Sequence, residues 1–105
     1  MGDVKAIVSE LRKKLAAIYG PDLRNVLLFG SQARGDAEPG SDIDVLVVLP
    51  GPVNPGAEVR RTGSLVAELS LKHDIVISCV FVSSENLAAE QSPFMMNVRK
   101  EGLVI

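Results

Sequence analysis

The sequence contains no tryptophan and only one cysteine, one tyrosine and one histidine among its 105 residues. The single cysteine, Cys79, excludes a disulfide framework and is typical of a reducing compartment. No apolar run approaches the roughly 18 residues of a membrane-spanning helix, and the polar N-terminus does not resemble a signal peptide. With 11 basic and 13 acidic residues, bulk charge does not predict nucleic-acid binding. We therefore expect a cytoplasmic protein that binds neither membranes nor, directly, nucleic acid.

The apolar content of the chain is sufficient for one core. Hydrophobic residues make up 47% of the chain and charged residues 23%, which is the composition of a folded globular domain and not of a disordered segment. A chain of this length has room for one core, so we predict a single domain over residues 1–105.

The spacing of apolar residues predicts alternating helices and strands. The predicted ranges are helices over residues 3–19 and about 57–71, and strands over 26–29, 42–49 and 74–82. Two shorter helices are expected afterwards, one capped by Ser83 or Ser84 and one that begins at Ser92-Pro93 and ends at Gly102. This order predicts an α/β (or α+β) fold in which helices cover a small sheet.

Two aspartates stand at the start of the second predicted strand. Asp42 and Asp44 alternate with apolar residues, so they point to the same face, with Cα atoms about 6.6 Å apart. Unpaired, the two carboxylates would repel each other, and carboxylate oxygens suit the hard cation Mg²⁺. Asp74, at the start of the third predicted strand, would complete a three-carboxylate set for two metal ions, or would merely cap that strand or pair with a nearby arginine.

The first predicted strand ends in Gly30-Ser31, which supplies a candidate anion site. A sharp turn there into a short helix would direct backbone N–H groups and the Ser31 hydroxyl toward a phosphate. Arg34 adds a permanent cation that either grips phosphate or remains a solvated loop charge. Together with the carboxylates, this predicts a pocket for a magnesium–nucleoside triphosphate.

Residues 29–48, F-G-S-Q-A-R-G-D-A-E-P-G-S-D-I-D-V-L-V-V, resemble the signature of the DNA polymerase beta-like nucleotidyltransferase superfamily: Gly-Ser, ten residues, then Asp-x-Asp. Within it, G-S-x-A-R-G and S-D-I-D are similar to the minimal nucleotidyltransferases, the MNT-type antitoxins found beside HEPN-domain toxins. His73-Asp74-Ile75-Val76 matches the place of that family's third carboxylate, and the ending S-P-F-x-x-N-V-R-K-E-G is also similar. Gln32 departs from the pattern, since a basic residue is frequent there.

The resemblance implies the polymerase beta-like fold, with a small mixed sheet of three or more strands flanked by helices. It implies that Gly30 and Ser31 hold the triphosphate, and that Asp42, Asp44 and Asp74 are the catalytic residues and hold two Mg²⁺ ions. The implied reaction transfers AMP from ATP to a hydroxyl, in this group a tyrosine of the partner HEPN-type toxin.

Two other functions remain open from the sequence. The chain could be a catalytically silent, nucleotide-binding antitoxin that inhibits its partner by covering it. An Asp-x-Asp glycosyltransferase ranks last, because we see no space for a sugar-acceptor subdomain. The apolar tail is a candidate docking surface for a partner; its residues are Phe94, Met95, Met96, Val98, Leu103, Val104 and Ile105.

Overall fold

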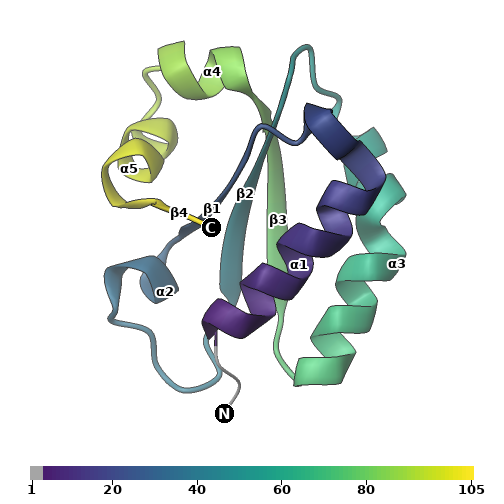
Figure 1. Cartoon of the computed structure of the whole chain (residues 1–105). Coiled ribbons are helices and arrows are strands. Elements are labelled where there is room, and N and C mark those ends of the chain that lie inside the picture. Colours follow the sequence, from purple (N-terminus) through teal and green to yellow (C-terminus); the bar gives the residue numbers. More distant parts are fainter. Residues whose placement is uncertain (1–3) are drawn as a thin grey trace.

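The computed structural model describes residues 4–105 and contains a sheet between two layers of helices (Figure 1). The helices are α1 (Val4–Tyr19), the 3₁₀ turn η1 (Gly20–Asp22), α2 (Ser31–Arg34), α3 (Pro55–His73), α4 (Ser84–Ala89) and α5 (Pro93–Glu101). The strands are β1 (Asn25–Phe29), β2 (Ile43–Leu49), β3 (Ile77–Ser83) and β4 (Leu103–Val104). This arrangement confirms the predicted α/β fold class; Asp3, the first residue of the predicted N-terminal helix, lies outside the described residues.

The sheet is mixed, with strand order β3-β2-β1-β4. β1 runs antiparallel to both β2 and β4, and β2 runs parallel to β3. The parallel pair is joined through α3, which is long enough to make the crossover that parallel strands require. In register, Phe29 pairs with Asp44 across β1 and β2, and Asp44 pairs with Ser78 across β2 and β3.

One face of the sheet is covered by α1 and α3, and this side contains the larger core. Apolar residues at helical spacing on α1 meet alternate residues of the strands, as the period of two along a strand requires. The buried members are Ile7, Val8, Leu11, Leu15, Tyr19, Val26, Leu28, Ile43, Val45, Val47, Leu49, Leu69, Ile77 and Phe81.

The opposite face is covered only in part. Leu46 and Val48 are buried against Val98 of α5, with residues of β1, β3 and α4 packed around them. Toward the start of β2 no helix covers the strands: Asp44 is only partly buried, Ser78 is exposed, and Val80 keeps 36% of its surface exposed. The polar end of this second face is the part of the sheet that is open to a ligand.

Side-chain caps fix where the helices begin. The N-cap residues of α3, α4 and α5 are Asn54, Ser83 and Ser92. Their side chains accept hydrogen bonds from the backbone N–H groups of Ala57, Asn86 and Met95, respectively, in the first turn of each helix. The predicted caps at Ser83 and Ser92 are thereby confirmed.

Within residues 4–105, no helix has the length and apolar character needed to cross a membrane.

One sequence expectation is corrected. The third strand begins at Ile77 and not at residue 74, because α3 continues to His73 and Asp74 forms its C-cap. The end of the apolar tail adds a fourth strand to the predicted sheet of three or more: Leu103 and Val104 pair with Leu28 and Leu27 of β1.

Candidate active site

Gly30 forms the sharp turn between β1 and α2. Its backbone angles, φ 74° and ψ −157°, lie in a region that is essentially restricted to glycine. A Cβ atom at this position would also lie only 2.5 Å from Oδ2 of Asp44, so the carboxylate would have to shift. The backbone conformation therefore requires glycine, and the absence of a Cβ atom lets the carboxylate approach the turn. The turn brings the start of α2 directly beside Asp44.

Asp42 and Asp44 form a close pair at this turn. Asp42, which is exposed, precedes β2, and Asp44 is the second residue of that strand. Partial burial, and secondarily the charge of Asp42, raise the pKa of the Asp44 carboxyl above its ordinary value. A carboxyl group whose ionisation is opposed by burial and by a neighbouring carboxylate constitutes a site that a cation would stabilise.

Gln32 holds the two halves of the site together. Its Nε2 donates a hydrogen bond of 3.1 Å to the carbonyl oxygen of Ser41, the residue before Asp42. The first turn of α2 is thereby tied to the segment that presents the carboxylates. Sequence comparison singled out Gln32 only as a departure from a basic residue; its amide role depends on a contact nine residues away and has no signal in the sequence.

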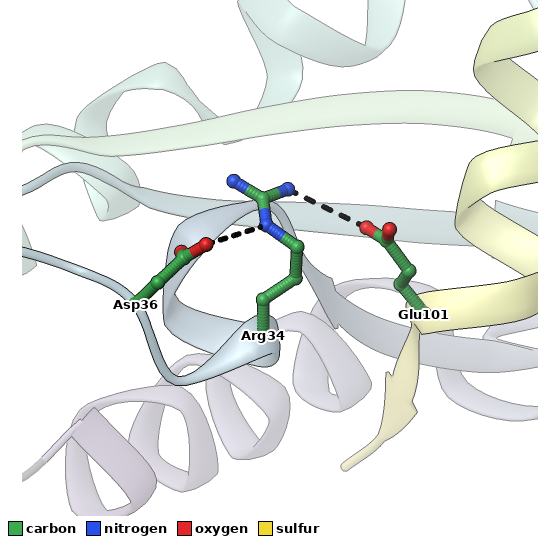
Figure 2. Close-up of polar contacts among 3 residues, drawn as sticks. All are labelled: Arg34, Asp36 and Glu101. Carbon is green, nitrogen blue, oxygen red and sulfur yellow. Dashed lines mark hydrogen bonds and ion pairs between the residues drawn. The ribbon is translucent and has the colours of Figure 1, made fainter.

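Arg34 lies at the end of α2, where its guanidinium is held between two carboxylates (Figure 2). Its Nε lies 3.1 Å from Oδ2 of Asp36, and its Nη1 lies 3.4 Å from Oε2 of Glu101 in α5. Hydrogen bonds to Asp36, first, and to Glu101 raise the pKa of this already permanent cation further. The predicted phosphate-binding side chain therefore serves here as a bridge between α2 and α5.

Asp74 lies at the end of α3, three residues before β3, and not on a strand as predicted. It caps α3 in the left-handed conformation, at φ 51°, with its backbone N–H directed to the carbonyl oxygens of Leu71 and Ser70. Among residues 4–105, no three His, Cys, Asp or Glu side chains are gathered so that they could hold one metal ion. The expected three-carboxylate set is therefore not assembled, because the third residue of the pattern ends a helix before the strand begins.

Ser78 occupies the place that a third carboxylate would need. It pairs with Asp44 in the parallel register of β2 and β3, so both side chains extend from the same face of the sheet. Ser78 is exposed there. Sequence reasoning missed this residue because a serine in an apolar run carries no chemical signal until the register is known.

The residues present fit Mg²⁺ with two carboxylate ligands and not with three. Asp42 and Asp44 offer hard oxygen donors that carry no other bond to a described residue, and the glycine at position 30 leaves room beside Oδ2 of Asp44. The adjoining turn supplies the Ser31 hydroxyl and the N–H groups of Ser31 and Gln32 that are predicted to bind phosphate, whereas the N–H groups of Ala33 and Arg34 donate to the carbonyl oxygen of Gly30.

Comparison with known proteins identifies the family. The sequence model of the nucleotidyltransferase domain matches residues 8–95, which include the glycine turn and both aspartates. The chain belongs to the nucleotidyltransferase domain family. A relative from Methanocaldococcus jannaschii named "Putative protein adenylyltransferase" is 36% identical over 107 residues, covering 100% of this chain and 99% of its own. The chain is thus a nucleotidyltransferase, similar along its whole length to a named protein adenylyltransferase.

Solved structures of nucleotidyltransferases share the fold. One described as a "putative nucleotidyltransferase from Sulfolobus solfataricus" aligns with a TM-score of 0.69 at 22% identity, covering 96% of this chain and 77% of that one. A second, from Shewanella oneidensis, contains a tri-AMPylated HEPN toxin in complex with an MNT antitoxin; it aligns with a TM-score of 0.57 at 19% identity, covering 97% and 71%. At these identities the likeness establishes the nucleotidyltransferase fold.

Proposed function

We propose that this nucleotidyltransferase transfers AMP from ATP to a tyrosine hydroxyl of a HEPN-type partner and thereby acts as the antitoxin of a toxin–antitoxin pair. The observation that carries the proposal is the approach of the Gly30 turn to the Asp44 carboxylate, because the turn is the predicted phosphate site and the carboxylate belongs to the predicted cation-binding pair. The named relative and the AMPylated HEPN toxin in a complex of the same fold support it.

The reaction is a substitution at the α-phosphorus of ATP. The acceptor oxygen forms a bond to that phosphorus, the bond to the β-phosphate oxygen breaks, pyrophosphate leaves, and the acceptor proton passes to solvent or to a neighbouring base. Bound Mg²⁺ would neutralise phosphate charge and orient the leaving group. Asp42 and Asp44 would hold the metal, and Ser31 with its backbone N–H would bind the departing phosphates.

The residues around the carboxylates favour a phenolic acceptor. Ser78, and not a third carboxylate, lies opposite Asp44, and a serine hydroxyl is a poor general base at neutral pH. A tyrosine hydroxyl, with a pKa near 10, gives up its proton far more easily than an aliphatic hydroxyl. A tyrosine acceptor therefore depends least on a general base in this site.

The test is intact-mass spectrometry of the HEPN partner after incubation with this protein, ATP and Mg²⁺. We expect mass gains in whole AMP units, which disappear with Asp44→Asn and persist with Asp22→Asn, a matched control on the exposed 3₁₀ turn. This chain should gain no mass on tyrosine: its only tyrosine, Tyr19, is 8% exposed and donates a 2.7 Å hydrogen bond to Glu58.

The second candidate function is inhibition by binding alone, and the missing third carboxylate favours it. In that case the partner would be inhibited at a one-to-one ratio without ATP, and Asp44→Asn would inhibit as well as the unmodified chain. Catalytic action would instead be substoichiometric and would require ATP. Inhibition at low ratio with whole AMP units on the partner would contradict the binding-only function.

A further inference from the structure

A groove of about 260 Å³ lies between the phosphate-binding turn and α5. Gly30 and Arg34 form one wall, and Phe94, Asn97 and Glu101 on α5 form the other. The bridge from Arg34 to Glu101, visible in Figure 2, fixes the distance between the two walls. The groove therefore begins at the predicted phosphate site and extends away from the two carboxylates.

The α5 wall carries an aromatic ring that the core does not use. Phe94 is 43% exposed and meets the partly buried Phe29 edge to face, with ring centroids 5.5 Å apart and an interplanar angle of 88°. Phe29 thus holds the Phe94 ring in place while leaving it accessible from the groove. A fixed, exposed aromatic ring is a surface on which a nucleobase stacks.

One helical turn further along α5, Asn97 offers the groove a free amide. Among residues 4–105, its side chain makes no hydrogen bond to the protein. An amide presents a donor and an acceptor side by side, which match N7 and the N6 amino group of adenine. Guanine presents two acceptors at the same edge, N7 and O6, so the same amide would satisfy only one of them.

We propose that this groove binds the adenosine part of the nucleotide, with the adenine stacked on Phe94 and its edge read by Asn97. The proposal rests on the proposed function, because it takes the phosphates to lie at Gly30 and Ser31. In this proposal, residues of α5 determine which nucleobase is bound. The phosphate-binding turn and the carboxylates contact only the phosphates and the metal, so they do not distinguish between bases.

The test distinguishes binding of the nucleoside from binding of the phosphates. Isothermal titration calorimetry of the whole protein, with Mg²⁺ and without acceptor, measures the Kd for ATP, GTP and inorganic tripolyphosphate. We expect Phe94→Ala to raise the Kd for ATP about tenfold, and to leave that for tripolyphosphate unchanged. Asn97→Leu should reduce the preference for ATP over GTP about tenfold. Met96→Ala is the matched control, since Met96 is 51% exposed on α5 and does not line the groove.

Each outcome decides the inference. Wild-type affinity for ATP in both Phe94→Ala and Asn97→Leu would overturn it, and so would an equal loss for ATP and tripolyphosphate. Phe94→Leu, which keeps an apolar side chain against Phe29, should show most of the loss of ATP affinity if Phe94→Ala fails to fold. Normal ATP binding with impaired modification of the partner would overturn the inference in favour of an acceptor groove, while the proposed function would stand. Failure of the unmodified protein to bind either ATP or tripolyphosphate would refute both.

Discussion

Asp44 extends its carboxylate into the space that a side chain at Gly30 would occupy. The space that a Cβ atom would occupy lies 2.5 Å from Oδ2 of Asp44, on a backbone whose φ is 74°. The glycine and the aspartate lie 14 positions apart in the sequence, yet the antiparallel pairing of β1 and β2 makes them one structural unit. The phosphate-binding turn and the carboxylate pair cannot therefore be altered independently.

Gly30→Ala should destabilise the protein more than Gly35→Ala. Both glycines have positive φ, but a Cβ at Gly35 would meet nothing within 4 Å. We expect the Gly30 backbone to cost about 1–3 kcal/mol of unfolding free energy, with the collision added to it. Chemical denaturation of both variants gives the comparison.

The collision is isolated by repeating Gly30→Ala in an Asp44→Ala background. Without the carboxylate, the cost of Gly30→Ala should fall by about 1 kcal/mol. An unchanged cost in that background would mean that the carboxylate is free to move away, and that the contact does not restrict position 30.

Asp44→Asn should stabilise the metal-free protein while removing its response to Mg²⁺. Because burial and Asp42 raise the pKa of Asp44 above 3.8, the folded state holds that proton more tightly than the unfolded state. Stability therefore falls as pH rises from 3.8 through the raised pKa. At pH 7 we expect Asp44→Asn to raise the Tm by roughly 2–4 °C, a modest gain because solvent screens the partly exposed carboxylate.

The difference between Asp44→Asn and the unmodified protein should shrink as pH falls through the raised pKa of Asp44, and it should vanish below 3.8, where the aspartate is protonated in both states. Thermal unfolding over a pH series checks the sign. Mg²⁺ should raise the Tm of the unmodified protein alone. A variant that melts below the unmodified protein at pH 7 would show that Asp44 is stabilised by its surroundings, contrary to the raised pKa.

Ser78→Asp should create the three-carboxylate set that the natural sequence lacks. The new carboxylate would extend beside Asp44 from the neighbouring parallel strand. We expect divalent-cation affinity to rise roughly tenfold, because affinity increases with the charge of the ligand set. Titration with Mn²⁺, followed by electron paramagnetic resonance of the free ion, measures it directly.

The matched control is Ser64→Asp, which adds the same charge at an exposed position of α3. Equal Mn²⁺ affinities for the two variants would mean that position 78 does not face the metal site. In the absence of a divalent ion, Ser78→Asp should be the less stable of the two, since three carboxylates then repel one another.

The fold could be predicted further than the site because the two depend on different kinds of information. Continuous apolar runs such as residues 26–29 and 45–49 predict buried strands locally, and Ser92-Pro93 predicts a helix start locally. The role of Ser78 depends on the register between two strands, and that of Gln32 depends on a carbonyl group in a different segment. Neither relationship has a local signal.

Asp74 illustrates the opposite error, in which a motif match misplaces a residue. The match to the family pattern and the apolar run after it both favoured a strand beginning at residue 74. The helix instead continues to His73, whose Nε2 lies 3.0 Å from Glu10 of α1, and Asp74 then turns the chain in the left-handed conformation. Aspartate is suited to such a cap, so its presence was compatible with both structures.

The apolar tail should be tested as a docking surface by substitution and not by deletion. Leu103 and Val104 pair with β1, and the N–H of Ile105 donates a 2.9 Å hydrogen bond to the carbonyl oxygen of Val26. Deleting residues 103–105 removes an edge strand and should cost about 2 kcal/mol of unfolding free energy, whatever binds there. Val104→Lys, at a side chain that is 68% exposed, should change stability by less than about 0.5 kcal/mol.

If the partner docks on the tail, Val104→Lys weakens binding while the Tm stays unchanged. Val59→Lys, at a residue that is 52% exposed on α3, places the same charge on the helix-covered side and should leave binding unaffected. Equal partner affinity for the two lysine variants, measured by titration calorimetry, would remove the tail from the interface. A deletion variant that melts like the full chain would in turn contradict the role of β4 in stability, because the edge pairing would then contribute nothing.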